Sequence, residues 1–507
     1  MLTYEQIMKR VKKSRETREI WNQHFRECYR YTIPERQTFD NFSPGQKKRE
    51  WVFDSTPVEA LEDYANRMES QVTPAWRNWA KLDVGAEIPE DQEETIQQYL
   101  EEASDVLFHN IKHSNFNSQI HEAYLDLGIS TGAIIVEEGD GISSALSYRA
   151  ISLSEILLEK QDNGRPETVY RDFKLPVKEI MEVFPYATLT SELNKMLTET
   201  PEKEVSLTEG IIKVKGGFEQ ILIWDNELEF LYQAQRKDSP WIIFRESTIP
   251  QEAYGRGRVM RALPDIKTLN KMVEDHLRAA SFTSNPIYTM MSDGVLNPYT
   301  ARLKPGTIIP VESNDRGNPS IAPLPQAGNY NVLQYDIRAL QDSIRQMMMS
   351  KPYGNIEETP VRTALEMSIR QADSQATTSA SGGRIQTELL EPLISKSVEI
   401  LVKAGKIAPL KVDGKQVTIK YTSPAARQQD SDDISNTLQF LNYLTALPPQ
   451  VAMSSVKMEE VPDYLAEKMG ISKKLIRSET ERKQIAAKTA QLVQENQGQV
   501  PQQQGQQ

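Results

Sequence analysis

The sequence predicts an α+β protein that is predominantly helical, with a region of antiparallel strands in its middle. Apolar residues recur every three or four positions before residue 130 and again after residue 264, which is typical of helices that bury one face. Between these regions lie short β-branched or aromatic runs, such as GIIKVK, EQILIW and WIIFRE, separated by the turn signals DG, DNG, GG and SP. The 507 residues suffice for roughly three folding regions.

Composition excludes several classes of protein. The net charge of −12 is not the basic surplus with which proteins grip DNA phosphates, although an acidic surface could let DNA slide. No apolar run approaches the roughly 18 residues of a membrane-spanning helix, so no membrane anchor is expected. Cys28 is the single cysteine, which excludes an intrachain disulfide and a cysteine-based metal cluster. The charged N-terminal residues lack the apolar core of a signal peptide, and we expect assembly in a reducing cytoplasm.

Helices are expected before the strands. The first lies within residues 1–40. The next begins with a capping box, in which Thr56 is the expected N-cap, Pro57 the first helical residue and Glu59 the box acid. Residues 92–127 are helical over about two helices. The β region that follows should hold about seven strands, with a helix near residues 176–184.

A pair of helices is expected on either side of an irregular insertion. The first begins at Pro264 and ends before Asn285-Pro286, because the residue before proline disfavours helix. The second covers residues 331–349 and has the 4-3-4 apolar spacing of a narrow seam that packs against another helix. The seam residues of the two helices are Ile266, Leu269, Val273, Leu277, Leu333, Ile337, Leu340 and Ile344.

A longer helix is expected over residues 363–405. Gly382 and Gly383 interrupt it, so a kink is predicted there, and Gly405 is a suitable C-cap. The segment KVDGKQVTIKYTS then predicts a hairpin with a DG turn. Helices are expected over residues 430–494.

Candidate chemical motifs are weak. The stretch YGRGR, residues 254–258, lacks the spacing and the Lys-Ser/Thr of a phosphate-binding P-loop, and it favours a tight corner before a helix. His109 and His113 share a helix face but lack the glutamate of a zinc-protease helix. A third motif, Asp430, Asp432 and Asp433, fits a helix N-terminus better than a cation site. We therefore expect no catalytic residue, cofactor site or metal site.

Several segments together give the chain a resemblance to a known family. They are FDST (53–56) through VTP (72–74), DLGISTGAIIV (126–136), YGRGRVMRALPDIKTLNKM (254–272), TALEMSIRQ, ELLEPLI and YTSPAARQ. In this order and spacing they resemble the head-to-tail connector, or portal, proteins of short-tailed bacteriophages, over about residues 5–490. The chain departs from the family in the small residues of QADSQATTSASGGR and in its glutamine-rich tail.

The resemblance implies a portal-type fold that assembles into a ring of twelve subunits around a DNA channel, in the virion, at one capsid vertex. It assigns residues 1–263 to a wing, 264–285 to the first stem helix, 286–330 to a clip, 331–349 to the second stem helix, 350–362 to a tunnel loop, 363–425 to a kinked long helix and a returning wing hairpin, 426–494 to a helical crown, and 495–507 to a disordered tail. Lys351, Asn355 and Arg362 are then the candidate DNA-facing residues. The implied partners are double-stranded DNA, major capsid and scaffolding proteins, terminase, tail adaptor and nozzle proteins, and internal ejection proteins.

The residues fit this expectation independently, since paired narrow seams are natural where copies pack side by side in a ring. Two alternatives stay open. One is a metal-dependent DNA-processing enzyme of the packaging system, with a metal among the Asp430, Asp432 and Asp433 carboxylates. The other is a helical adaptor of one or two chains that forms no ring.

Overall fold

The chain folds into two compact units. The computed structural model describes residues 2–36, 39, 50–85, 90–159, 164–225, 229–284, 288–290, 321–323, 330–350, 382–409, 417–422, 424–445, 456 and 461–469. One unit comprises Met1–Ser70 and Asp105–Asp413, and the other comprises Gln71–Ser104 and Gly414–Gln507. Among the described residues, no helix combines the length and the apolar character needed to span a bilayer.

The predicted N-terminal helices are confirmed. They are α1 (Tyr4–Thr32), α2 (Thr56–Val72), α3 (Glu90–Lys112) and α4 (Phe116–Ile129). The predicted cap of α2 is displaced, because Thr56 is already helical and its backbone N–H donates to the Asp54 carboxylate at 2.9 Å. The side chain of Ser55, not Thr56, contacts Glu59.

Two antiparallel sheets confirm the predicted β region. The smaller has the order β3-β2-β9, and the larger has the order β4-β5-β6-β7-β8. The strands are β2 (Thr131–Glu138), β3 (Leu146–Ala150), β4 (Ile156–Leu158), β5 (Val169–Pro176), β6 (Glu204–Val214), β7 (Gly217–Trp224), β8 (Phe230–Arg236) and β9 (Trp241–Arg245). A short helical segment, η2 (Val177–Glu179) and α5 (Ile180–Val183), confirms the helix expected there, and α6 (Ser191–Glu199) was not predicted.

Different helices pack on the two faces of the five-stranded sheet. Ile7 and Val11 of α1 pack against one face, where Ile212 and Ile221 are buried. The opposite face is covered by α5 and α6, and its core contains Phe184, Leu193, Leu207, Leu222 and Trp224. Buried side chains on both faces explain why the central strands β6 and β7 read as apolar runs rather than as alternating ones.

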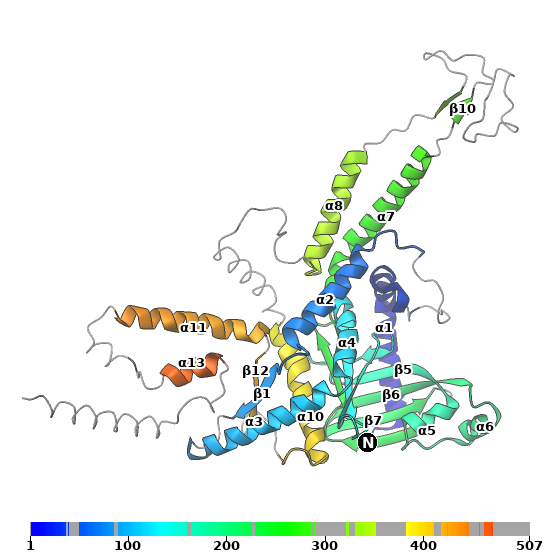
Figure 1. The fold of residues 1–507 in the computed structure, drawn as a ribbon. Coiled ribbons are helices and arrows are strands. Elements are labelled where there is room, and N and C mark those ends of the chain that lie inside the picture. The colour runs from blue at the N-terminus through cyan, green and yellow to red at the C-terminus, as the bar shows by residue number, and fades with distance from the viewer. Residues whose placement is uncertain are drawn as a thin grey trace, which may run out of the picture. The chain divides into compact units, whose positions relative to one another are not determined.

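Two long helices, α7 (Arg258–Ser284) and α8 (Tyr330–Met347), lie side by side and project from the first unit (Figure 1). We call them the helical hairpin. Between them in the chain, β10 (Tyr288–Met290) pairs antiparallel with β11 (Ile321–Pro323). The prediction that the first helix begins at Pro264 is wrong, because Pro264 lies inside α7, which begins six residues earlier.

The long helix before Gly405 is described from residue 382 onward. It is helical at Gly382 and Gly383, widens into a π-turn, η3 (Gln386–Leu390), and continues as α10 (Glu391–Lys403). The described part of the helix thus has an irregularity just after the two glycines, and the residues before Gly382, which the predicted kink also involves, lie outside the described residues. Gly405 has a φ of +70°, the left-handed conformation that glycine adopts easily, so it ends the helix as predicted.

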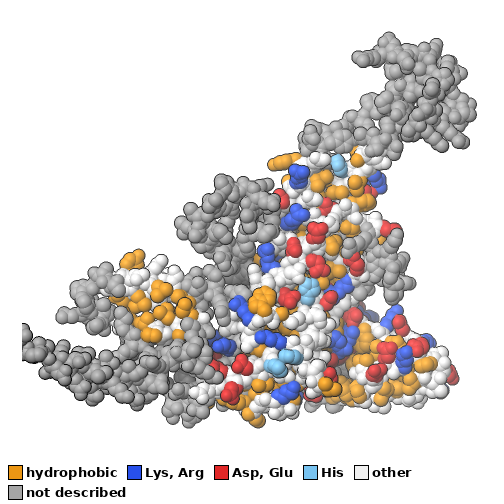
Figure 2. Space-filling model, viewed as in Figure 1, with side chains coloured by type: hydrophobic (Ala, Val, Ile, Leu, Met, Phe, Trp, Pro, Cys, Tyr) orange, Lys and Arg blue, Asp and Glu red, His pale blue; other side chains and the backbone are white. Residues whose placement is uncertain are grey.

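The described part of the second unit includes a two-stranded sheet, most of α3, and the helices α11 and α13. The strand β1 (Ala80–Val84) pairs antiparallel with β12 (Val417–Tyr421), so VTIKY pairs with a strand far away in the sequence. The other half of the predicted DG hairpin lies outside the described residues. α11 (Pro424–Thr445) packs against α13 (Val461–Met469). Figure 2 shows hydrophobic side chains gathered over this region, and Leu438, Phe440 and Tyr443 of α11 are exposed.

Candidate functional site: the base of the helical hairpin

The chain enters the helical hairpin through a corner built around YGRGR. Tyr254 is buried, and its hydroxyl donates to the carbonyl of Ile156 and accepts from the N–H of Leu158, both at 3.1 Å. The backbone N–H of Gly255 donates to the Thr131 hydroxyl at 2.9 Å. The Ser130 hydroxyl donates to the carbonyl of Gly255 at 2.7 Å. The corner is thereby fixed onto the junction between α4 and β2.

The two glycines are required by close backbone approach. A Cβ atom on Gly257 would lie 2.3 Å from the carbonyl oxygen of Gly128 and 2.4 Å from backbone atoms of Ile129. On Gly255 it would lie 2.4 Å from the carbonyl oxygen of Ser130. Backbone atoms cannot move aside as a flexible side chain can, so only glycine fits at either position.

The backbone amides and arginines of the corner are already engaged. The N–H groups of Arg256 and Gly257 donate to the carbonyls of Ser247 and Ile129, at 2.9 and 3.1 Å. The guanidinium of Arg256 pairs with Glu252, and that of Arg258 pairs with Glu246 at 2.6 Å. A phosphate-binding loop needs free amides and free cations. YGRGR is therefore a structural corner, as its spacing predicts.

Beside the corner, at the base of the helical hairpin, a buried ion pair links the three-stranded sheet to the π-turn η3. Arg245, the last residue of β9, contacts both carboxylate oxygens of Glu388 in η3, with the Nη2–Oε1 distance at 2.8 Å. Arg245 also donates to the carbonyl of Ala253, in the corner. Both side chains are almost fully buried, so each charge depends on the other for compensation.

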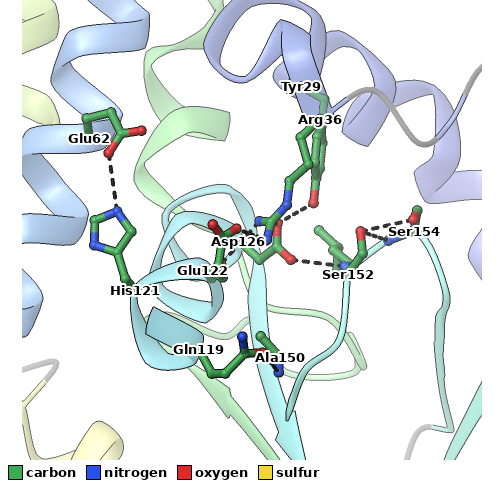
Figure 3. A network of polar contacts seen from close by, with 11 residues as sticks. Tyr29, Arg36, Glu62, Gln119, His121, Glu122, Asp126, Ala150, Ser152 and Ser154 are labelled. Atoms are coloured by element: carbon green, nitrogen blue, oxygen red, sulfur yellow. Dashed lines mark hydrogen bonds and ion pairs between the residues drawn. The ribbon is translucent and has the colours of Figure 1, made fainter. Parts of the chain in front are cut away.

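A second buried network lies at the C-terminal end of α4 (Figure 3). The Asp126 carboxylate accepts from the Tyr29 hydroxyl, from Arg36 at 3.1 Å and from the backbone N–H of Leu153 at 3.1 Å. Burial raises the pKa of Asp126, while Arg36 and these hydrogen bonds oppose the rise. Asp126 thus ties α4, which carries the corner's docking surface, to the end of α1 and to the loop before β4.

Residues 53 and 54 complete the base by contacting both helices of the hairpin. The backbone N–H of Phe53 donates to the Asn270 side chain of α7 at 2.8 Å. Gln341 of α8 donates to the Asp54 carboxylate at 2.7 Å. The base therefore joins FDST, DLGIST, YGRGR and the start of ELLEPLI, four of the segments that carry the family resemblance.

The predicted seam residues divide into a buried set and an exposed set. Ile266, Leu269 and Ile344 are fully buried at the base. Val273, Ile337 and Leu340 are half-buried, and Leu277, two turns beyond Leu269, is 53% exposed. The side chain of Leu333 lies outside the described residues. Tyr335, on the outer half of α8, is 75% exposed, and charged side chains of both signs lie on the face of the hairpin that Figure 2 shows.

The remaining candidate residues lie elsewhere. Lys351, Asn355 and Arg362 lie outside the described residues, as do the side chains of Asp430 and Asp432. His113 contacts the carbonyl of His109 at 2.7 Å through Nδ1, and the described residues contain no group of three ligands that could hold a metal ion. Sequence reasoning missed Arg245, Glu388 and Asp126, because a single charged residue in a strand or helix gives no local signal of a distant partner.

Two comparisons with known proteins extend the resemblance. The family described as bacteriophage head to tail connecting protein matches residues 4–476. The probable portal protein of Bordetella phage BPP-1 is 20% identical to this chain, in an alignment that covers 93% of this chain and 88% of the relative. The match thus spans both units and the whole helical hairpin.

Proposed function

The chain belongs to the family of bacteriophage head-to-tail connecting proteins, and we infer that it is a portal protein whose copies form a ring at one capsid vertex. Double-stranded DNA passes through the ring during packaging and ejection. The family is structural, and no reaction is assigned to this chain. ATP hydrolysis for packaging belongs to a separate terminase that docks on the ring.

The observation that carries the ring is the contrast along the helical hairpin. Its base is closed by buried seam residues, by the corner and by the Arg245–Glu388 pair. Farther out, the side chains of Leu277 and Tyr335 are 53% and 75% exposed on the same helix pair. Apolar seams of this kind are buried when copies pack side by side, and a repeated head-to-tail contact closes into a ring. Twelve copies is the number we propose.

The charge of the chain suits a conduit for DNA. With a net charge of −12, a ring of copies would repel phosphates over most of its surface, so DNA could move through without being held. Residues 350–362 are proposed to line the narrowest part, where Lys351, Asn355 and Arg362 touch DNA transiently. A variant with this loop shortened should form rings that package DNA but retain it poorly. Unchanged retention would remove the loop from this role.

The partners are assigned by region as part of the same proposal. The segment between α7 and α8, which includes β10 and β11, is the docking site for terminase and later for the tail adaptor and nozzle proteins. The wing region, which contains the three-stranded and the five-stranded sheets, faces the capsid and scaffolding proteins. The helical C-terminal region, which includes α11 and α13, faces the packaged DNA and internal ejection proteins.

The direct test is negative-stain electron microscopy of the purified protein, combined with its mass by light scattering. Rings with a central hole about as wide as a DNA duplex, roughly 20 Å, and a mass near twelve chains are the expected result. A mass of one or two chains at every salt and protein concentration would contradict the portal ring and favour a helical adaptor.

A further inference from the structure

Two isoleucines of the first unit project from its surface. Ile142, in the loop between β2 and β3, is 92% exposed, and Ile20, in α1, is 81% exposed. Among the described large apolar residues, none is more exposed than these two. A single exposed isoleucine is ordinary on a protein surface. The surroundings of these two, described next, distinguish them.

Ile142 sits on a loop that its own hydrogen bonds hold rigid. The Asp140 carboxylate accepts from the backbone N–H groups of Ile142 and Ser143, at 3.0 and 3.1 Å, and from the Ser143 hydroxyl. These hydrogen bonds lower the pKa of Asp140, so the loop stays anionic. Glu138, beside it, is exposed and adds a second negative charge. The loop therefore presents an apolar tip with an acidic edge.

The loop is also fastened to α3 through Asn110, near the end of that helix. The Ser144 hydroxyl donates to the carbonyl of Asn110 at 2.8 Å. The Asn110 side-chain oxygen accepts from Lys406 at 3.0 Å and from the N–H of Ala145 at 3.4 Å. A side chain held on such a fixed platform loses little conformational entropy when it binds a partner.

Ile20 lies at the end of a basic stripe on α1. Lys9, Lys13 and Ile20 fall on one line of the helix, with Lys12 and Glu16 beside them. The three lysines are exposed, and none has an acidic partner among the residues that the structure describes. The lysines begin about two turns before Ile20, and Glu16 and Glu19 are the exposed charges nearest to it. The charge opposite to that of the acidic loop is therefore carried by Lys9, Lys12 and Lys13, at a distance from the isoleucine.

These two surfaces belong to opposite sides of the five-stranded sheet. Thr208 of β6 faces α1, because its hydroxyl accepts from Arg15 at 2.8 Å. The neighbouring Glu209 must point to the other face, where it lies within electrostatic reach of Glu137 and Arg149, on the two strands that carry the Ile142 loop. A contact between opposite sides of one subunit cannot be made within that subunit. It can be made by a row of copies that face the same way.

We propose that the 139–145 loop of each copy docks on the Lys9–Ile20 stripe of α1 in the adjacent copy, with Ile142 packed beside Ile20 and Glu138 beside the lysines. The contact rests on the proposed ring, and it adds a second subunit interface separate from the helical hairpin. The partner is a second copy of this chain because the chain carries both complementary surfaces.

Disulfide trapping tests the contact in the assembled full-length protein. The Ile20→Cys/Ile142→Cys variant should form a ladder of covalent multimers under mild oxidation, read on a non-reducing gel. Cys28 does not compete, because it is buried and burial raises the pKa of its thiol. The matched control is Met181→Cys/Ile142→Cys, since Met181 is exposed on α5, which covers the side of the sheet opposite α1. It should give no ladder.

Charge reversal gives an independent readout. Glu138→Lys and Lys13→Glu should each raise the protein concentration needed for ring formation by about tenfold. In the double variant this concentration should return most of the way to that of the parent protein. Normal rings that form no ladder, or single variants that assemble like the parent, would overturn this contact and leave the portal ring intact. Ladders that stop at the dimer, also seen with Ile142→Cys alone, would show a two-fold contact instead. If the parent forms no rings, the proposed function fails, and this contact fails with it.

Discussion

The two helices of the helical hairpin, α7 and α8, have different surroundings at their base and along their outer half. At the base, apolar side chains, glycines and charged groups all have partners within the subunit. Farther out, a leucine on the same seam as a buried one is half exposed. The base is thus closed by contacts within one chain, and our proposal is that neighbouring chains cover the outer half. Each prediction below alters one side of this comparison.

The largest effect is expected at the buried ion pair. Arg245→Met should lower the free energy of unfolding by about 3–5 kcal/mol, because Glu388 would remain buried without its cation. Denaturant unfolding of dissociated subunits measures the change. The control is Arg245→Met/Glu388→Leu, which removes both charges and should recover a large part of the loss. Equal losses in the single and double variants would show that packing, and not charge compensation, matters at this place.

The second largest loss of free energy of unfolding is expected for a buried leucine at the base. Leu269→Ala should cost about 2–5 kcal/mol, because Leu269 is fully buried and its removal leaves a cavity. The same unfolding measurement applies. A loss below about 1 kcal/mol would mean that the base can collapse around the missing side chain, and that it is less rigid than its contacts indicate.

The next largest loss of free energy of unfolding is expected at the corner glycine, Gly257. Gly257→Ala should cost about 1–3 kcal/mol, because its Cβ would collide with backbone atoms of Gly128 and Ile129. Gly383→Ala is the matched control, since a Cβ there meets nothing within 4 Å and the residue is helical. That change should stabilise the chain by about 0.5–1 kcal/mol. If both variants had the same stability, close approach would not be the reason for glycine at position 257.

The corner shows what the sequence can predict. Glycines on either side of an arginine before a periodic helix indicate a tight turn, and the structure has one. The helix start was misplaced, because proline usually marks the first turn of a helix. Here Arg258, Val259 and Ala262 are held by tertiary contacts, so α7 begins earlier and Pro264 removes only one helical hydrogen bond.

The ion pair shows what the sequence cannot predict. Arg245 and Glu388 are 143 positions apart, and the residues around each give no signal of the other. The same is true of Asp126 and Tyr29, which are 97 positions apart. Periodicity finds which face of an element is buried, but it carries no information on which elements meet. Periodicity therefore identified Ile266, Leu269 and Ile344, which are buried at the base, whereas the charged groups that fix the base required the structure.

The smallest effect on a single chain is expected in the outer half. Leu277→Ala should change the free energy of unfolding of dissociated subunits by less than about 0.5 kcal/mol, because half of the side chain already faces solvent. If neighbouring copies cover it, the same change should weaken ring formation, which light scattering against protein concentration measures. Leu269→Ala is the matched comparison, with the same substitution eight residues earlier on the same helix. A Leu277→Ala variant that loses stability as a monomer but assembles normally would reverse the roles assigned to the two halves.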